Sequence, residues 1–402
     1  MSGAVTIPTH IGRTMHRQRT FFLAVFVLVL SSCGRSAAER ATLESAVIAN
    51  YVAIVHTSYE DSLTRTKQLQ VAISAFLDSP SDATLRIAKE RWLAAREPYG
   101  QTEAYRFYGG PIDDADGPEG LINAWPLDEA YVDYVEGAPR SGILSDLSTY
   151  PTIDRDLLIS LNEAGAEENI SVGFHAIEFL LWGQDRSVEG PGERPYTDYV
   201  EGGAAHADRR ARYLAIVADL LTDDLEDMVA AWAPDDPENY RAEFTAMDRS
   251  AAIQNILIGI GVLSKSELAG ERIFTAYDNQ DQEDEHSCFS DNTHRDIIAN
   301  ALGIANVFTG RYVRIDGTSV EGLGMNDLLQ AVDPESAAEL ASLIDRGLES
   351  VRAIPAPFDR AIIDPESRPL VLEAVYALQD QGDKIAQVGT QLGVTINTAL
   401  PE

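Results

Sequence analysis

Cysteine is nearly absent from this sequence, whose 402 residues include only Cys33 and Cys288. Two cysteines cannot build the set of disulfides that stabilises many small secreted proteins, so the hydrophobic core must stabilise the fold. Hydrophobic residues make up 45% of the chain, which supplies such a core and excludes wholesale disorder. The length allows two domains or one large one.

Basic residues are also scarce. There are 31 Lys and Arg against 64 Asp and Glu, so the net charge is −33. This charge repels phosphate backbones and anionic lipid headgroups, and we therefore expect no nucleic-acid partner. The same charge attracts cations, but an acidic surface also serves solubility alone. The overall charge therefore permits a cation-binding function without arguing for one.

The N-terminus lacks an apolar run long enough to cross a bilayer. Ten apolar residues at 21–30 follow the basic Arg17 and Arg19, and small residues come after them. A basic start, a short apolar run and small residues beyond it are typical of a secretory signal. We expect residues 1–32 to be this signal. The segment Leu-Ser-Ser-Cys that ends at Cys33 resembles a bacterial lipobox.

The lipobox resemblance implies that Cys33 carries a lipid and becomes the new N-terminus. The acyl chains would then attach a soluble protein to a membrane, and residues 33–40 would form a linker. Gly34 after the cysteine favours the outer membrane, so we expect a lipid-anchored protein in the periplasm or on the cell surface. The alternative is an ordinary secreted protein in which Cys33 is incidental.

Strand patterns are lacking in the rest of the chain, which contains long amphipathic segments instead. Their 3.6-residue periodicity and their flanking Ser, Asp, Gly and Pro residues predict helices at 43–77, 81–108, 152–164, 172–182, 204–232, 248–280, 292–308, 334–354 and 365–392. We expect an all-α fold of two packed helical bundles. The prolines near residue 236 suggest an N-terminal bundle at 41–236 and a C-terminal bundle at 237–402.

The most informative segment is residues 172–183, VGFHAIEFLLWG, in which only His175 and Glu178 are neither apolar nor glycine. A helix that is apolar on every side is expected to be buried on every side. A lone buried carboxylate costs several kcal/mol or more unless it is paired, protonated or bound to a metal. The two residues are three apart, so they share one face and can reach one ligand. The alternative is a pair that hydrogen-bonds within the core and binds nothing.

Three sequence blocks resemble the imelysin family. Gly173, His175 and Glu178 match its Gly-x-His-x-x-Glu signature, residues 94–113 match an earlier block, and residues 285–297 match a later one. The resemblance implies two helical bundles with a site near their interface, an extracytoplasmic location and a role in iron acquisition. It also brings a peptidase label, since some members are described as metallopeptidases.

Other residues are candidates to complete a metal site with His175 and Glu178. Glu103 is expected on a helix with three supporting residues on the same stripe, namely Arg96, Tyr99 and Arg106. An exposed ladder of ion pairs is the alternative there. Further on, Asp291 and His294 are three apart near a helix start, and Asp291 either ligates a metal or caps that helix.

Two functions compete for this site. A carboxylate and imidazole donor set suits iron, which predicts a protein that binds iron or an iron chelate and passes it to an uptake transporter. A zinc peptidase is the alternative, although the His-Glu-x-x-His motif of zincins is absent from the sequence. Zinc would need a third ligand, for which His294 is the best candidate, and an acid/base residue such as Glu103. An adhesion or scaffold lipoprotein is a third class.

Overall fold

The structure is a computed structural model that describes residues 1–4, 6, 15–187 and 189–400, with the side chains of the first helix described from residue 38. Except for residues 1–4 and 6, the predicted signal at 1–32 therefore lies outside the residues whose side chains are described, and so does the predicted lipid attachment at Cys33. No helix in the described part of the chain is long and apolar enough to span a bilayer.

The fold is all-helical, as the sequence predicts. The α-helices are α1 (Met15–Asp78), α2 (Asp82–Thr102), α3 (Glu119–Ile122), α4 (Glu129–Val132), α5 (Gly142–Ser145), α6 (Arg155–Leu161), α7 (Gly173–Trp182), α8 (Ala207–Ala231), α9 (Tyr240–Ala246), α10 (Arg249–Val262), α11 (Thr275–Asn279), α12 (Thr293–Thr309), α13 (Met325–Val332), α14 (Pro334–Ala353), α15 (Phe358–Ile363) and α16 (Arg368–Leu392). Shorter or irregular helices are η1 (Glu103–Tyr105), η2 (Tyr196–Tyr199), the π-helix η3 (Leu263–Phe274) and η4 (Gln282–Asp284).

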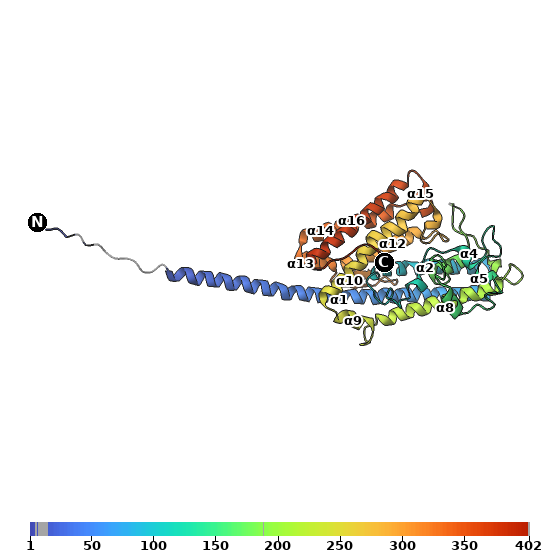
Figure 1. Ribbon diagram of the computed structural model, residues 1–402, viewed down its shortest axis with the longest axis horizontal. Coiled ribbons are helices and arrows are strands. Elements are labelled where there is room, and N and C mark those ends of the chain that lie inside the picture. The colour runs from blue at the N-terminus through green and yellow to red at the C-terminus, as the bar shows by residue number, and fades with distance from the viewer. Residues whose placement is uncertain (5, 7–14, 188, 401–402) are drawn as a thin grey trace.

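The helices pack in two groups along one long axis. In the N-terminal group, α1 packs between α2 and α8, and α7 packs against α2 and α8. In the C-terminal group, α16 packs against α14, η3 and α10. Figure 1 shows α14 and α16 on one side of α10 and α12, with α1, α2 and α8 on the other, while the start of α1 projects from the body.

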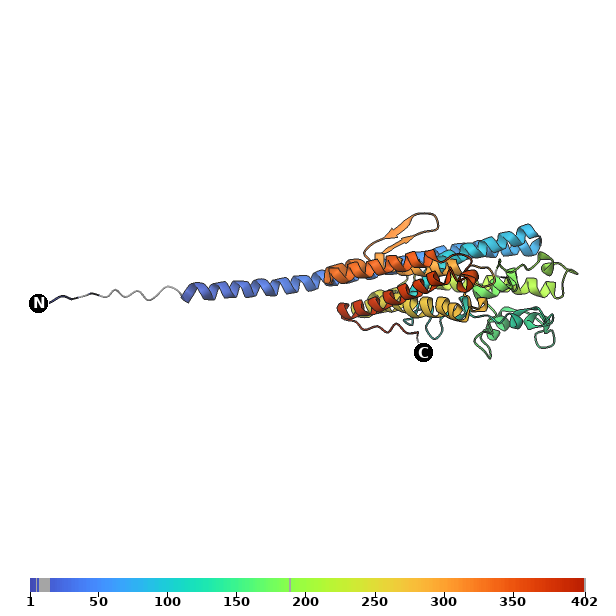
Figure 2. The same cartoon turned by 90° about the horizontal axis from the view of Figure 1, so that it is seen from above.

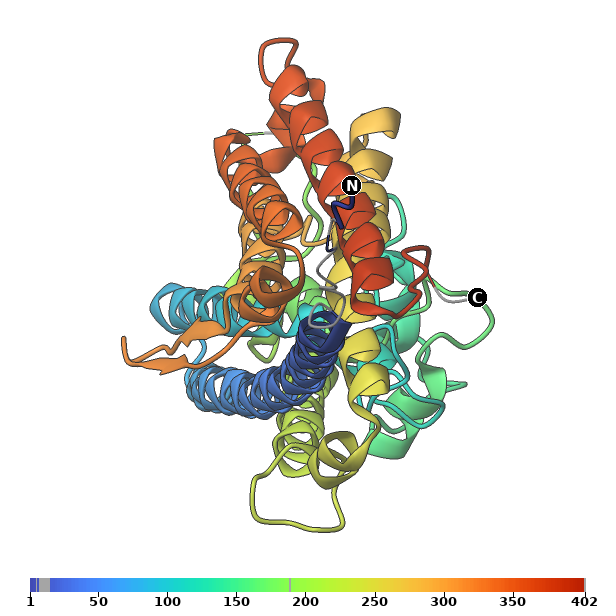
Figure 3. The ribbon, with the colours of Figure 1, turned by 90° about the vertical axis from the view of Figure 1, so that its left-hand side faces the viewer.

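Contacts between α2 and α12 and between α1 and α10 join the two groups, and one cluster of buried hydrophobic side chains runs through both. The end-on view in Figure 3 shows how closely the groups adjoin. The predicted boundary near residue 236 falls in the exposed turn between α8 and α9.

Two local predictions are wrong. The sequence predicts helix up to residue 108, but α2 ends at Thr102, a 3-10 turn covers Glu103–Tyr105, and Phe107 has a φ of 73°. A left-handed residue cannot continue a right-handed helix. The second exception is a small antiparallel hairpin of β1 (Arg311–Val313) and β2 (Ser319–Glu321), which stands at the edge of the body in Figure 2.

Candidate functional site: a buried polar network around His175

Helix α7 is buried on every side, as its apolar sequence predicts. All ten of its residues are buried, because α2 and α8 flank it. Its first residue is Gly173, whose φ of +83° suits glycine; a Cβ there would lie 2.6 Å from the Ile122 carbonyl oxygen. The indole of Trp92 on α2 donates to the Phe174 carbonyl at 2.9 Å. These contacts fix where α7 starts and which way its polar face points.

His175 and Glu178 contact each other on that face, and their side chains are 1% and 0% exposed. Nδ1 of His175 lies 3.0 Å from Oε2 of Glu178. The other carboxylate oxygen, Oε1, accepts from the backbone N–H and the hydroxyl of Ser290, at 3.0 and 2.6 Å. Nε2 of His175 is buried and has no hydrogen-bond partner. Both oxygens of Glu178 are therefore occupied, while one imidazole nitrogen is left without a partner.

Burial controls the protonation of this pair. It raises the pKa of Glu178 to about 8, against the effect of the Ser290 hydrogen bond, because a charged carboxylate is poorly solvated there. It lowers the pKa of His175 well below its usual range, and the nearby His286 and Arg96 act in the same direction. His175 is therefore a neutral imidazole at neutral pH, which is the form that binds metals.

A second histidine, His286, lies next to the first, with ring centroids 4.8 Å apart and a near edge-to-face arrangement. Its Nδ1 is 3.3 Å from Asp296 and its Nε2 is 3.4 Å from the amide nitrogen of Asn123. Burial, with Arg272 as the next cause, lowers the pKa of His286 to about 4. Two neutral imidazoles therefore lie next to each other in the interior of the protein.

Arg96 connects these groups to α12. Its guanidinium donates to both oxygens of Asp296, at 3.1 and 3.0 Å, and to the amide oxygen of Asn123. The guanidinium also lies 4.9 Å from the centre of the Phe174 ring. Burial alone would raise the pKa of Asp296, but Arg96 and His286 outweigh it and hold the pKa far below the usual range. Arg96 and Asp296 thus form a buried ion pair that contacts His286 through Asp296.

Glu103 forms a separate ion pair at the end of α2. Its carboxylate accepts from Arg272 of η3 at 2.6 Å and from Arg106 at 2.8 Å. Burial would raise the pKa of Glu103, but these two arginines lower it to about 2. The Glu103 carboxylate is also 3.5 Å from the Asn123 amide, which links this pair to the histidine network.

The other predicted residues lie in different surroundings. The ring of Tyr99 packs against Phe174 in a tilted arrangement, and its buried hydroxyl has no hydrogen-bond partner. Asn292, not Asp291, occupies the N-cap of α12, and no side chain caps that helix. Asp291 interacts with carboxylates outside the histidine network, and Nδ1 of His294 is buried without a partner.

Among the described residues, no three His, Cys, Asp or Glu side chains meet at the spacing of a preformed metal site. The structure brings together His175, Glu178 and His286, and Asp296 contacts this group through His286.

Several network residues were not singled out from the sequence, namely Asn123, Arg272, His286, Ser290 and Asp296. His286, Ser290 and Asp296 lie in the block at 285–297 that resembles the imelysin family. That resemblance is the one feature of the sequence that indicates a functional role for them. Asn123 and Arg272 gave no signal, since each reaches the network through tertiary packing alone.

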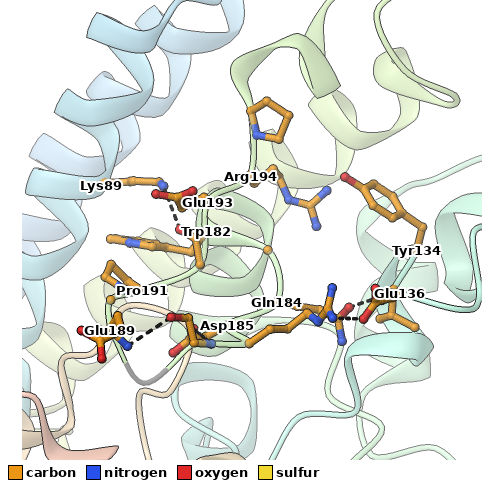
Figure 4. Close-up of a pocket in the computed structure, with 17 residues that line it drawn as sticks. Lys89, Tyr134, Glu136, Trp182, Gln184, Asp185, Glu189, Pro191, Glu193 and Arg194 are labelled. Atoms are coloured by element: carbon orange, nitrogen blue, oxygen red, sulfur yellow. Dashed lines mark hydrogen bonds and ion pairs between the residues drawn. The ribbon is translucent and has the colours of Figure 1, made fainter. Parts of the chain in front are cut away.

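A pocket of about 840 Å³ lies at the C-terminal end of α7 and is lined mainly by the loop that follows the helix. Figure 4 shows Lys89, Trp182 and Glu193 on one side and Gln184 with Glu136 on another. His175 and Glu178 do not line this pocket.

The comparisons with known proteins agree with this architecture. A curated relative, iron-regulated protein A of Synechococcus elongatus, is 27% identical over 368 residues, which cover 89% of this chain and 88% of that protein. A solved structure from Parabacteroides distasonis, described as an iron-regulated protein A precursor, has a TM-score of 0.67 at 22% identity and covers 87% of this chain and 95% of that one. An imelysin-like protein from Psychrobacter arcticum has a TM-score of 0.63 at 13% identity, with 89% and 98% covered.

The two solved structures show a common fold, and the sequence match goes further. Residues 55–385 match the sequence profile described as imelysin. This span includes all three blocks identified above, and the chain therefore belongs to the imelysin family.

Proposed function

We propose that this protein binds iron at the His175–Glu178 pair and serves iron uptake from outside the cytoplasmic membrane, attached through a lipid on Cys33. The observation that carries the proposal is the Nε2 atom of His175, which is buried and has no partner. Leaving a buried polar nitrogen unsatisfied costs about 1–3 kcal/mol, so such an atom indicates a ligand.

Glu178 prepares this nitrogen for a metal. Burial keeps Glu178 mostly protonated at neutral pH while no ion is bound, and a cation at Nε2 of His175 would favour the ionised carboxylate. Nδ1–H of His175 would then donate to Oε2 of Glu178, and Nε2 would present a lone pair to the ion. Ser290 supports the arrangement by donating twice to the other oxygen. A carboxylate behind a ligating imidazole fixes the ring and increases its basicity.

The surrounding donors suit iron. His286 places a second neutral imidazole beside the first, and Glu178 supplies carboxylate oxygens on the same face of α7. Nitrogen and oxygen donors of this kind match a borderline-to-hard cation better than a soft one. The Synechococcus relative is named as iron-regulated, which is consistent with an iron-related function.

A zinc peptidase fits the geometry less well. A peptidase must admit a peptide and a water molecule to its metal, whereas His175 and Glu178 are 1% and 0% exposed. A single ion needs far less access than a peptide. The same experiment decides between the two functions.

The experiment compares metal content and peptide cleavage in the purified mature chain. We expect about one iron per chain after anaerobic loading with Fe²⁺ and removal of excess metal, and no cleavage of a peptide library. His175→Ala and Glu178→Ala are expected to lose the iron. His206→Asn is the matched control, because His206 is partly exposed, has a φ of 58° that asparagine tolerates, and lies outside the network. Zinc with peptide hydrolysis that both alanine variants abolish would instead establish the peptidase.

The lipid anchor has its own test. Expressed with its N-terminus intact in a bacterium, the wild-type protein is expected to partition into the detergent phase of Triton X-114 and to incorporate labelled palmitate. Cys33→Ser should remove both properties, while Cys288→Ser, which changes the buried cysteine, should leave them. Equal partitioning of wild type and Cys33→Ser would refute the anchor without affecting the iron proposal.

A further inference from the structure

A second group of carboxylates lies outside the histidine network. Asp185 follows α7, Glu285 follows η4, Asp291 precedes α12, and Asp359 lies on α15. Asp185, Glu285 and Asp359 are 3%, 1% and 2% exposed, and Asp291 is partly buried. We call these four residues the carboxylate cluster. The cluster draws its members from segments far apart in the sequence.

The four carboxylates act on one another electrostatically. Burial raises the pKa of Glu285, and the charges of Asp359, Asp291 and Asp185 act in the same direction, whereas a hydrogen bond with the Thr293 side chain lowers it. Asp185 and Asp291 also act on the pKa of each other. Like charges held this close repel each other and destabilise a fold unless something positive offsets them.

The protein itself supplies little compensation. Oε1 of Glu285, Oδ2 of Asp185 and both carboxylate oxygens of Asp359 are buried and lack a side-chain or backbone partner at good hydrogen-bond geometry. Arg360, next to Asp359, is exposed and lowers the pKa of Asp359 only against the larger effect of burial. None of the ion pairs among the described residues involves any member of the cluster. Buried carboxylate oxygens without donors are the chemistry of a cation site.

A route from solvent reaches this cluster. Asp185 lines the pocket of about 840 Å³ together with Glu189, which is exposed and whose charge also acts on Asp359. In Figure 4, Asp185 and Glu189 lie on the side of the pocket away from Arg194 and Tyr134. A cation that enters the pocket therefore meets acidic side chains on the way to the buried ones.

We propose that Asp185, Glu285, Asp291 and Asp359 bind a hard divalent cation, with Ca²⁺ as the best match. All the donors are oxygens, which hard cations prefer. Ca²⁺ accepts six to eight oxygens in irregular arrangements, whereas Mg²⁺ demands near-octahedral geometry at short distances. The imidazole-based site at His175 has a different donor set, so the two sites are chemically distinct.

Binding requires a small rearrangement, because no three of these side chains stand at ligand spacing. Glu285, Asp185 and Asp359 each have at least one buried oxygen without a hydrogen-bond partner that can turn to an ion, and Oδ1 of Asp185 accepts from the Ser187 N–H. A bound ion would connect the loop after α7 in the N-terminal group with α12 and α15 in the C-terminal group. We therefore expect Ca²⁺ to stabilise the contact between the two groups of helices.

The test is calcium titration of the full chain after treatment with EDTA and gel filtration. Isothermal titration calorimetry is expected to show one Ca²⁺ site, with Mg²⁺ binding at least about tenfold more weakly. Saturating Ca²⁺ should raise Tm by about 3 °C or more. An unchanged Tm together with no calorimetric heat up to millimolar Ca²⁺ would overturn the proposal.

Two variants locate the site. Asp359→Asn and Glu285→Gln are expected to lower the Ca²⁺ affinity at least about tenfold, because each removes a charged ligand. Both should match or exceed the Tm of the wild type in EDTA, since each relieves repulsion among buried carboxylates. Asp345→Asn on α14 is the matched control, being an exposed aspartate far along the chain from the cluster, and it should change neither value.

The result can be separated from the iron proposal. His175→Ala should retain the calcium response, so a failure of the iron proposal leaves the calcium proposal intact. A failure of calcium binding likewise leaves the iron proposal intact. The inference fails if Asp359→Asn lowers Tm equally with and without Ca²⁺, since that pattern describes a structural aspartate. It also fails if both cluster variants bind Ca²⁺ as the wild type does.

Discussion

Glu103 offers the sharpest test of how the buried network is held together. The sequence predicts it as a metal ligand, whereas its carboxylate accepts from Arg272 and Arg106 in the structure. Glu103→Gln keeps the shape of the side chain but removes its charge. The change removes the fully buried counter-charge of Arg272, which is 3% exposed and keeps an ion pair with the less buried Glu267 at 2.8 Å.

The expected cost follows from the pKa. A fall from 4.5 to about 2 on folding corresponds to about 3 kcal/mol of stability at neutral pH. Because the folded-state pKa is lowered, this contribution is present above pH 4.5 and is lost as the pH falls toward 2. We expect about half of it to remain at pH 3. Removing one partner of a buried ion pair costs about 3–5 kcal/mol in other proteins, which agrees with this value.

The assay is urea unfolding followed by far-UV circular dichroism at pH 7, 5 and 3 in the presence of EDTA. Glu103→Gln should be about 3 kcal/mol less stable than wild type at pH 7 and 5, and the gap should narrow by about half at pH 3. Glu97→Gln on the adjoining helix α2 is the control, because the Glu97–Arg295 pair is about 40% exposed and should contribute under about 1 kcal/mol.

Two outcomes would refute this reasoning. One is a Glu103→Gln variant that unfolds like wild type at pH 7. The other is a stability gap that does not change between pH 5 and pH 3. If the variant also lost its iron while keeping its stability, Glu103 would be a ligand, as the sequence alone suggests.

Two further changes test close contacts in the N-terminal group of helices. Gly173→Ala should destabilise the protein by at least about 2 kcal/mol in urea unfolding, because its φ is +83° and a Cβ would lie 2.6 Å from the Ile122 carbonyl oxygen; a variant as stable as wild type would contradict the close contact. Asp133→Asn should cost about 3–5 kcal/mol, because Asp133 pairs with both Arg194 and Arg210 in the interior. A loss below about 1 kcal/mol in the same measurement would show that the two arginines find other partners.

The sequence predicts those parts of the site that depend on one helix. The apolar run at 172–183 predicts that α7 is buried all round, and the three-residue spacing predicts that His175 and Glu178 share a face. Both follow from helical geometry, which a local pattern specifies. The all-helical fold is also predicted, because amphipathic periodicity repeats over many long segments.

The sequence does not predict parts that depend on packing between distant segments. Arg272 lies on η3, about 170 residues after Glu103, and nothing in its local pattern indicates that it reaches that carboxylate. His286 reaches His175 through a loop whose path is set by tertiary contacts. Arg106 is expected on the stripe of α2, but the helix ends at Thr102 and the chain turns at Phe107. For Arg272 and His286 the deciding contact is non-local, whereas for Arg106 it is the local break of the helix.

Glu178→Gln separates metal binding from the structural role of the His175–Glu178 pair. A glutamine oxygen can still accept from Ser290, which leaves the glutamine NH₂ group to donate to Nδ1 of His175. The proton of the neutral imidazole must then sit on Nε2, and an N–H cannot bind a metal. We therefore expect Glu178→Gln to fold with a stability within about 1 kcal/mol of wild type, since the hydrogen bonds of the pair are preserved.

The same variant is expected to retain less than about a tenth of the iron that the wild type binds, because loss of the carboxylate behind a ligating histidine typically weakens binding by about 10–100-fold. The measurement is metal content after loading with Fe²⁺, alongside urea unfolding of the same samples. If His175 and Glu178 only form a hydrogen bond to each other within the core and bind no ion, wild type and Glu178→Gln will bind equally little iron. Equal and stoichiometric iron in both would show that the ion lies elsewhere, because no neutral imidazole held by a donor at Nδ1 can offer Nε2 as a ligand.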